Sequence, residues 1–331
     1  MHIPLALRTP LLKKLHCRLP IMLAGMGGVA RHELAAAVCQ AGGFGVLGMV
    51  REPVERVRHE IKSLREKTSL SFAVNLIPAA TDKALLQAQV AECLAQGVKS
   101  IVLFWTVDAP LIQHLKQEGV QVIHQVGSVA EAEQALAAGA DILIAQGVEA
   151  GGHVRGLTST LALLPPVVEL SDVPVVASGG IANGATLAAA LALGAQGASL
   201  GSAFLATTEA NAHPHHKQRV LEAGCDDTLL TEIFVGSWPQ GAPVRVLPNA
   251  ITQGQYRGDR TTVIARQDDT DIYAYSTDSP LVGATGELEL MAQYCGQSAA
   301  QINALVSVHE RIAEILQGAG QTTDHWGAQS P

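Results

Sequence analysis

The chain has 331 residues, of which 48% are hydrophobic, 16% charged and 4% aromatic, a composition that excludes disorder and predicts buried strands with alanine-rich helices. Lys and Arg total 22 against 30 for Asp and Glu, so the formal net charge is -8, and no block of basic residues is present. This charge pattern excludes a nucleic-acid-binding surface and predicts no nucleic-acid partner.

The N-terminal 20 residues are interrupted by prolines and charged residues, among them Pro4, Pro10 and Lys13. This pattern fits neither a secretory signal nor a membrane-spanning helix. The five cysteines, at positions 17, 39, 93, 225 and 295, are odd in number and lie far apart without a CxxC pair. They are therefore expected to be free thiols rather than disulfides or zinc ligands. Together these features predict a cytoplasmic protein without a membrane partner.

Short apolar runs alternate with alanine-rich helical segments from about residue 21 to about residue 205, which is the pattern of βα units around a parallel sheet. Each apolar run is nearly continuous, as a strand buried on both faces requires. We predict eight strands, at residues 21–26, 44–48, 71–77, 100–105, 120–126, 141–147, 173–178 and 198–203. Helices are predicted between them, including residues 33–40, 54–66, 84–96, 130–138 and 185–193.

Beyond residue 206 this alternation stops, and the segment to about residue 280 is richer in Pro, Asp, Thr and Arg. We expect an α/β fold, a single (β/α)8 TIM barrel with a smaller insertion subdomain after the eighth strand. The predicted division is a barrel over residues 1–206, an insertion over the barrel mouth at 207–280, and a C-terminal helical segment at 281–331 that returns to the barrel. Its last helix is predicted at residues 301–316, followed by a frayed tail.

Glycine-rich loops follow the seventh and eighth predicted strands. Ser178, Gly179 and Gly180 follow the seventh strand, and Gly201 with Ser202 closes the eighth. Backbone N–H groups exposed by glycines suit a phosphate dianion, and barrels of this type bind phosphate at these two loops. Tight turns without a ligand are the alternative. A third glycine run, residues 43–48, satisfies G-x-G-x-x-G, but it follows a predicted helix and becomes a strand, which is the wrong context for a dinucleotide fingerprint.

His153 lies in another glycine-rich loop, residues 146–156, at the end of the sixth predicted strand. The flanking glycines let the backbone approach a planar ligand, and an imidazole there can donate a hydrogen bond or transfer a proton near neutral pH. We therefore predict that His153 is catalytic, against the alternative of a structural histidine. All of these loops lie at the carboxyl ends of predicted strands, where barrel active sites are built.

Two other clusters contain metal-ligating residue types, but their composition argues against a metal site. Residues 213–216 are His-Pro-His-His, with no carboxylate or cysteine at ligand spacing, and predict a solvent-exposed helix start. Residues 268–271 lack the glycine and the distal Glu of a calcium loop and predict a solvated turn. No metal is therefore predicted.

The combination of these motifs resembles the nitronate monooxygenase family, formerly called 2-nitropropane dioxygenases. It is carried by Pro-Ile-Met-Leu-Ala-Gly-Met at residues 20–26, Gln-Gly-Val-Glu-Ala-Gly-Gly-His at 146–153, Ser-Gly-Gly-Ile at 178–181 and Gly-Ser-Ala-Phe at 201–204. It extends to Ala-His-Pro at 212–214 and Tyr-Cys-Gly-Gln-Ser at 294–298, and so covers nearly the whole chain. The flavin-dependent enoyl-acyl-carrier-protein reductases share Glu-Ala-Gly-Gly-His, the glycine loops and Ala-His-Pro.

The resemblance implies an FMN-dependent TIM barrel and assigns residues to the cofactor. Gly25 and Met26 would lie along the isoalloxazine, and Asn75 and Gln125 would hydrogen-bond the flavin. The ribityl chain and phosphate would be lined by Ala150, Gly151, Ser178, Gly179, Gly180, Gly201 and Ser202. A strand-end cap is the alternative for Asn75, and a solvated polar residue is the alternative for Gln125.

In function, the resemblance implies oxidation of alkyl nitronates or nitroalkanes by FMN and O2 to a carbonyl compound and nitrite, without a required nicotinamide donor. His153 would hydrogen-bond the nitro group and, for a neutral nitroalkane, could remove the α-proton. Two alternatives stay open: an NAD(P)H-dependent FMN reductase of enoyl thioesters or quinones, and a flavin-binding barrel that acts as a partner subunit. The oligomeric state is also open, with a homodimer among the alternatives.

Overall fold

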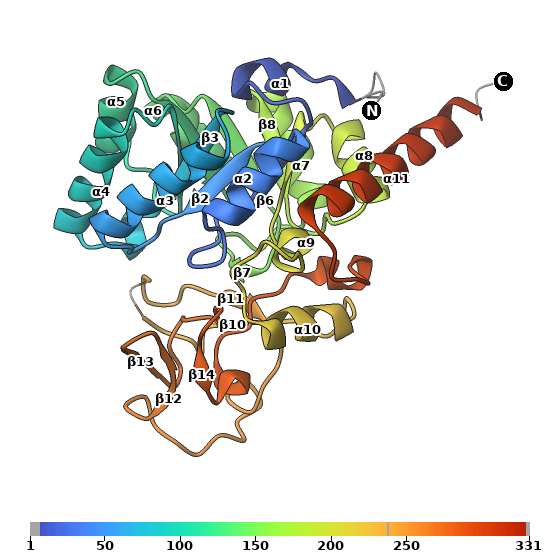
Figure 1. The fold of residues 1–331 in the computed structure, drawn as a ribbon. Coiled ribbons are helices and arrows are strands. Elements are labelled where there is room, and N and C mark those ends of the chain that lie inside the picture. Colours follow the sequence, from blue (N-terminus) through green and yellow to red (C-terminus); the bar gives the residue numbers. More distant parts are fainter. Residues whose placement is uncertain (1–6, 237, 329–331) are drawn as a thin grey trace.

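The computed structural model describes residues 7–236 and 238–328. Within these residues, eight parallel strands form a sheet in the order β1-β9-β8-β6-β5-β4-β3-β2, surrounded by helices (Figure 1). A parallel bridge between Met22 and Phe44 joins the two ends of the sheet, so that the barrel closes. The strands are β1 (Ile21–Leu23), β2 (Gly45–Gly48), β3 (Phe72–Leu76), β4 (Ser100–Phe104), β5 (Gln121–Val126), β6 (Ile142–Gln146), β8 (Val175–Ser178) and β9 (Gly197–Leu200). The predicted (β/α)8 barrel is confirmed, and each predicted strand is present but shorter than expected.

Nearly every residue of the barrel strands is buried, because helices cover the outer face and side chains fill the interior. The glycine run at residues 43–48 serves this packing. It follows α2 (His32–Ala41) and enters β2, as its sequence context predicted. A Cβ atom at Gly45 would lie 2.6 Å from the sulfur of Cys39, so glycine is needed there for the helix to pack on the strand.

Helices connect the strands and form the outer layer. They include α3 (Val54–Lys67), α4 (Lys83–Ala95), α5 (Ala109–Gln117), α6 (Val129–Ala138), α7 (Thr160–Leu170) and α8 (Gly184–Ala192). The side chains of Asp82, Ser128 and Asn183 accept hydrogen bonds from first-turn N–H groups, which stabilises the starts of α4, α6 and α8. Each of the five helices that we predicted by range is confirmed to within one residue at both ends.

The C-terminal helix differs from the prediction. Residues Gln297–Gln301 form a 3-10 helix, η4, and α11 spans Val308–Ala328, so the helix predicted at 301–316 was placed too early, and the predicted frayed tail is helical up to the last described residue. Gly318 does not end the helix, because it faces Gly184 of α8. A Cβ at Gly318 would lie 3.3 Å from the Cα of Gly184. This close approach of α8 and α11 overrides the low helix propensity of glycine.

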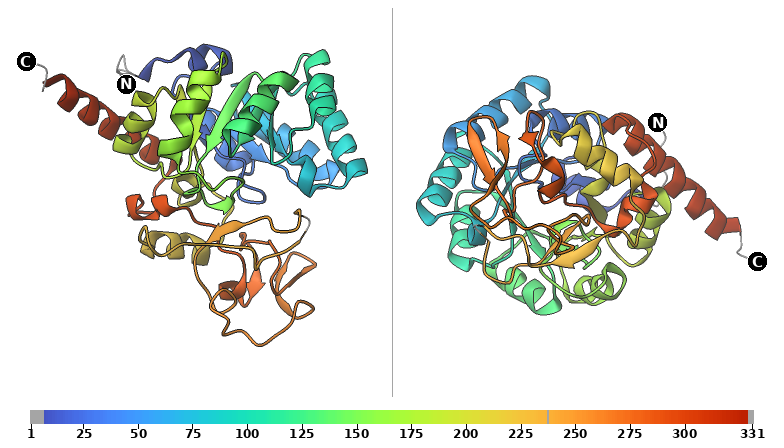
Figure 2. Two further views of the ribbon diagram at one scale, coloured as in Figure 1. Left: turned by 180° about the vertical axis from the view of Figure 1, so that it is seen from behind. Right: turned by 90° about the horizontal axis from the view of Figure 1, so that it is seen from below.

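Most of the chain between β9 and η4 forms a second layer against the carboxyl ends of the barrel strands, while α1 (Pro10–Leu15) lies at the opposite end (Figure 1). Seen from below, the loops of this layer lie across the ring of strands (Figure 2). The layer packs around its own apolar cluster, which includes Phe234, Ile264 and Met291. Met291 lies beyond the boundary predicted at residue 280, and the three-part division of the chain stays a prediction. The elements that follow β9 are α9 (Ser202–Leu205), α10 (Pro214–Glu222), β10 (Leu229–Thr231), β11 (Val244–Val246), β12 (Val263–Gln267), β13 (Thr270–Tyr273), β14 (Thr285–Gly286) and η3 (Leu288–Leu290).

The histidine cluster at residues 213–216 starts a helix, as predicted, but it is not solvent-exposed throughout. His213 caps α10 by accepting the N–H of His215 at 3.0 Å. His216 is fully buried, and its Nε2 lies 3.0 Å from the carbonyl oxygen of Tyr294. The prediction was wrong for His216, because α10 packs this side chain against residue 294 of the returning chain.

Three further features can be compared with the sequence. Asp268 and Asp269 are exposed in the turn between β12 and β13, as predicted, but Thr270 and Asp271, which were also predicted in that turn, begin β13 because they pair with β12. All five cysteines are free thiols, which confirms that prediction. Among the helices of the described residues, none combines the length and the apolar character needed to cross a membrane.

Candidate active site

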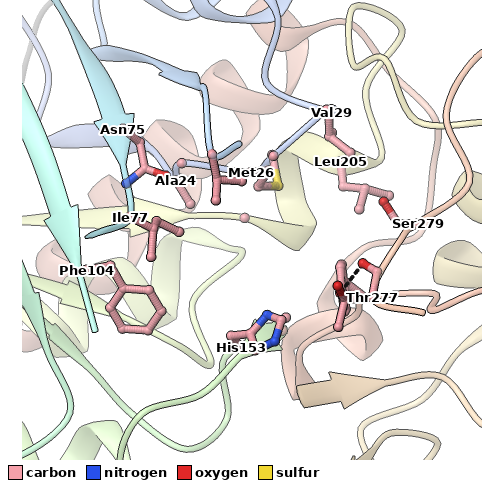
Figure 3. A pocket seen from close by; sticks show the side chains of 18 of the residues that line it. Ala24, Met26, Val29, Asn75, Ile77, Phe104, His153, Leu205, Thr277 and Ser279 are labelled. Carbon is pink, nitrogen blue, oxygen red and sulfur yellow. Dashed lines mark hydrogen bonds between the residues drawn. The ribbon is translucent and has the colours of Figure 1, made fainter. Parts of the chain in front are cut away.

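A cavity of about 440 Å³ lies at the carboxyl ends of the barrel strands, between the barrel and the second layer. Its volume is in the range of small-molecule and cofactor sites. In Figure 3, Asn75, Ala24 and Met26 lie on one side of the cavity and His153 on the other. The structure brings together every residue predicted for the site, although their individual roles stay predictions. These residues are Gly25, Met26, Asn75, Gln125, Ala150, Gly151, His153, Ser178, Gly179, Gly180, Gly201 and Ser202.

A short strand positions His153. Strand β7 (Gly152–His153) pairs antiparallel with β11, which places His153 opposite Val244. The Gln146 side chain holds the loop at two points, since its Nε2 donates to the His153 carbonyl at 3.0 Å and its Oε1 accepts the Arg155 N–H at 3.2 Å. Gln146 is the last residue of β6, so the barrel and the second layer hold His153 between them.

Aromatic rings enclose the His153 imidazole. The Trp238 ring stacks on it, with the ring centroids 3.5 Å apart and the planes at 12°. Trp105 and Tyr294 contribute two further rings, each with its centroid 6.1 Å from that of His153. Tyr294 lies in one of the motifs that carry the resemblance, whereas Trp105 and Trp238 were not predicted for the site. The chain has only three tryptophans and four tyrosines, and their scarcity was the one feature of the sequence that could have pointed to these rings as site residues.

Burial holds His153 in its neutral form. The surrounding side chains exclude water, and the positive charge of Arg51 adds to the cost of protonation, so the pKa of His153 is lowered to about 3. Its Nε2 is buried and has no hydrogen-bond partner among the described residues. A buried polar atom without a partner is costly and calls for an explanation such as a ligand. At neutral pH the imidazole therefore offers an uncharged donor and an uncharged acceptor.

Asn75 has an unpaired amide oxygen. Its Nδ2 donates to the carbonyl oxygen of Val102 at 3.1 Å, whereas its Oδ1 is buried without a partner within the described part of the chain. Gly25 leaves room for this amide, because a Cβ at Gly25 would lie 2.5 Å from Oδ1. Gln125, from the end of β5, lines the same cavity. This region can therefore accept a hydrogen bond from a ligand.

Two glycines after β8 have backbone conformations that other residues adopt only with strain. Gly179 has φ 101° and Gly180 has φ 72°. A Cβ at Gly179 would lie 3.0 Å from the carbonyl oxygen of Gly147, whereas one at Gly180 would meet only the Glu149 side chain, at 3.7 Å. The loop after β8 therefore packs on the loop after β6. Of the two glycines, Gly180 has room for a side chain and Gly179 does not.

Residues outside the predicted site anchor these loops. The Glu149 carboxylate accepts the Thr160 N–H at 2.9 Å at the start of α7. The Thr160 hydroxyl also lies 3.0 Å from the carbonyl oxygen of Gly179, so it links the loops after β6 and β8. The Arg245 Nε donates to the Val148 carbonyl at 2.9 Å. Thr160 and Arg245 belong to no recognisable motif, and only the fold brings them to the glycine loops.

Acid is expected to destabilise the fold through two buried histidines. Burial lowers the pKa of His216 to about 4 and that of His153 to about 3, against about 6.5 in an unfolded chain. Below about pH 6.5 the unfolded state therefore binds protons that the folded state excludes. The stabilisation from each neutral histidine is complete above that pH and declines as the pH falls toward the folded pKa. For His216 we expect a loss of about 2 kcal/mol between about pH 7.5 and about pH 5.

The variant His216→Gln removes this titration. Urea unfolding at several pH values should show a smaller decline in the free energy of unfolding with acid than in the wild type, whatever the variant's stability at neutral pH. His309→Gln, at an exposed position of α11, is the control and should keep the wild-type decline. The same decline in His216→Gln and in the wild type would contradict the prediction.

Comparison with known proteins identifies the family. The family model described as Nitronate monooxygenase matches residues 8–318. A curated relative from Mycobacterium tuberculosis, (3aS,4S,5R,7aS)-5-hydroxy-7a-methyl-1-oxo-octahydro-1H-indene-4-carboxyl-CoA dehydrogenase, is 34% identical over 257 residues, which cover 77% of this chain and 70% of the relative. The nitronate monooxygenase of Paraburkholderia phytofirmans is 33% identical over 262 residues, covering 66% of this chain and 71% of that protein.

Solved structures extend the similarity over the whole fold. FabK from Thermotoga maritima superposes with a TM-score of 0.83 at 29% identity, covering 98% of this chain and 99% of that chain. The nitroalkane oxidase from Streptomyces ansochromogenes superposes with a TM-score of 0.78 at 28% identity, covering 95% of this chain and 99% of that chain. These relatives set aside the alternative of a barrel without enzymatic activity. The chain belongs to the nitronate monooxygenase family and is an oxidoreductase.

Proposed function

We propose that this enzyme binds one FMN noncovalently in the cavity and uses it to oxidise alkyl nitronates with O2 to a carbonyl compound and nitrite. The observation that carries the proposal is a neutral, unpaired imidazole at the same cavity as an unpaired amide and the glycine loops. Family membership and the similarity to the nitronate monooxygenase of Paraburkholderia phytofirmans and the nitroalkane oxidase of Streptomyces ansochromogenes support the choice of substrate.

The residues at the cavity fit a flavin mononucleotide. The unpaired Oδ1 of Asn75 would accept a hydrogen bond from the polar edge of the isoalloxazine, beside Gly25 and Met26. The backbone at Gly180 and at Gly201 lines the cavity without side chains, as close approach to a phosphate dianion requires. These residues therefore suit a ligand with a flat, polar-edged ring at one end and an anionic group at the other.

Bound FMN would supply the electron transfer that no side chain of this chain provides. The protein's part is to bind and orient the substrate. His153 would donate a hydrogen bond to a nitro oxygen, and the nearby charge of Arg51 would favour an anionic substrate. Phe104, Trp238 and Ile77 line the cavity with apolar surface that would accept an alkyl chain and exclude water.

The low pKa of His153 bears on which form of the substrate is used. A base whose conjugate acid has a pKa of about 3 removes a carbon-bound proton poorly near neutral pH. A hydrogen bond to a nitronate that is already ionised requires only the neutral imidazole. We therefore propose the nitronate, rather than the neutral nitroalkane, as the form that this site suits.

An NAD(P)H-dependent reduction of enoyl thioesters or quinones is the second candidate. The observation that favours it is an extension of the cavity lined by Arg31, Arg51 and Arg56, where Arg31 is paired with Glu52 at 2.6 Å. Guanidinium groups suit phosphates, so this extension could receive a phosphate-bearing donor or substrate. The similarity to FabK and to the CoA-ester dehydrogenase of Mycobacterium tuberculosis is compatible with this candidate.

Anaerobic mixing separates the two candidates. We expect a nitronate to bleach the visible flavin absorbance of the protein, and NADPH at the same concentration to leave it unchanged on that timescale. Denaturation of the protein should release FMN rather than FAD, as measured by chromatography. Bleaching by NADPH and not by the nitronate would favour the reductase. Protein that stays colourless after incubation with FMN would contradict both candidates.

A further inference from the structure

Residues 294–301, which we call the C-terminal clasp, pack on the loops proposed to hold the phosphate end of FMN. The Gly296 N–H donates to Ser202 Oγ at 3.0 Å, just after β9. The Gln297 N–H donates to the Glu149 carbonyl at 3.0 Å, in the loop after β6. A Cβ at Gly151 would lie 2.6 Å from the Gly296 nitrogen, so the clasp lies directly against that loop.

Gln301, the last residue of the clasp, fixes the loop after β8 on both sides of Ile181. Its Nε2 donates to the Gly180 carbonyl at 2.9 Å, and its Oε1 accepts the Ala182 N–H at 3.0 Å. The same Oε1 lies 3.0 Å from the Thr186 hydroxyl, which is part of the capping box of α8. One side-chain amide thus ties the glycine loop to the start of the next helix.

These contacts determine which way the peptide that joins Gly180 to Ile181 faces. In a trans peptide the C=O and the N–H point in opposite directions, and the described residues contain no cis peptide. Gly180 and Ile181 line the cavity, whereas Gln301 is not among the described residues that do. The Gly180 carbonyl is therefore held toward Gln301, and the Ile181 N–H points away from Gln301.

We infer that Gln301 is a positioning residue for the phosphate of FMN, because it keeps this N–H turned toward the phosphate and the carbonyl turned away. The inference rests on the proposed function. Gly180, at φ 72° and without a Cβ, leaves the peptide free to turn over once the contacts with Gln301 are lost. A reversed peptide would direct a carbonyl oxygen at the dianion and weaken the phosphate site, while the isoalloxazine contacts would stay intact.

The test compares FMN with riboflavin, which has the same ring and ribityl chain but no phosphate. Gln301→Met keeps the length of the side chain and removes both the donor and the acceptor. We expect the Kd for FMN to rise roughly 30-fold, the scale of losing the two neutral hydrogen bonds from Gln301 to the loop backbone at Gly180 and Ala182, and the Kd for riboflavin to change by less than about twofold. Both constants are measured from flavin fluorescence during titration with apoprotein.

Gln297→Met is the matched control, since it changes the same residue type in the same 3-10 helix and its side chain forms no hydrogen bond with the described residues. It should leave both Kd values unchanged. Equal losses of FMN and riboflavin affinity in Gln301→Met would overturn the inference, as would no loss of either. Wild-type protein that binds riboflavin as tightly as FMN would instead contradict the proposed phosphate site.

A second variant keeps the test decisive if Gln301→Met does not fold. Gln301→Glu retains the shape and the acceptor but places a negative charge behind the loop. It should weaken FMN binding by roughly 30-fold or more, again with riboflavin affinity close to that of the wild type. Unchanged FMN affinity in Gln301→Glu would overturn the inference.

Discussion

Gly180→Asp is expected to raise the Kd for FMN by about 10³-fold, because it places a carboxylate at the proposed phosphate site. At about 4 Å and an effective dielectric constant of about 20, two unit charges repel by about 4 kcal/mol, and about 1.4 kcal/mol corresponds to a tenfold change in Kd. Space for the side chain exists, since a Cβ at Gly180 meets its nearest neighbour, the Glu149 side chain, at 3.7 Å. The fold itself should lose about 1–2 kcal/mol, the cost of a left-handed conformation without glycine.

The matched control is Gly180→Asn, which has the shape of Asp without its charge and tolerates a positive φ comparatively well. We expect its Kd for FMN to rise by less than about tenfold. The difference between the two variants therefore reports the charge alone, and urea unfolding of the apoproteins reports the strain that they share. If Asp and Asn at this position weaken FMN binding equally, the loop after β8 does not hold the phosphate.

Burial patterns made the barrel predictable from the sequence. Strands such as β3 and β4 are buried along their whole length, and a strand in that position must be apolar at nearly every residue. The predicted first strand was too long for a physical reason. Gly25 and Met26 continue the apolar run, but they leave the sheet and line the cavity.

The structural features that the sequence did not predict depend on contacts between distant parts of the chain. The pairing of β7 with β11 joins residues far apart in the sequence, and at two and three residues neither segment has the length of an ordinary strand. The same holds for the candidate site. Its glycines and His153 lie in recognisable motifs, whereas only tertiary packing brings Trp238 to His153 and Gln301 to the loop after β8.

The structure changes the expected role of His153, which the sequence predicted as both a hydrogen-bond donor and a possible base. An imidazole with an ordinary pKa near 6.5 could serve both as a hydrogen-bond donor and as the base that deprotonates a nitroalkane. Burial and the charge of Arg51 lower the pKa of His153 to about 3, and each unit of lowering costs proton transfer to it about 1.4 kcal/mol. Donation to an anionic nitro group carries no such cost, so this role is the one expected to dominate.

His153→Ala is therefore expected to lower kcat/KM for a pre-ionised nitronate by about 10²-fold, the usual scale for removing one donor to a charged group in an active site. The loss for the neutral nitroalkane should be about the same, because proton removal is not the step that His153 assists. His153→Asn keeps an amide donor and should lose only about tenfold on both substrates. In the wild type, kcat/KM for the nitronate should show no titration of His153 between about pH 5 and about pH 8, since its pKa is lowered to about 3.

The measurement is kcat/KM for both substrate forms, with the FMN content of each variant determined by absorbance so that lost cofactor is not counted as lost catalysis. A loss for the nitroalkane that exceeds the loss for the nitronate by about tenfold or more would show that His153 is a base after all. A rise in wild-type kcat/KM through about pH 6.5 that disappears in His153→Asn would lead to the same conclusion, because only a titrating imidazole could produce it. Losses below about twofold on both substrates would leave His153 with the structural role of supporting the Trp238 ring stacked on it.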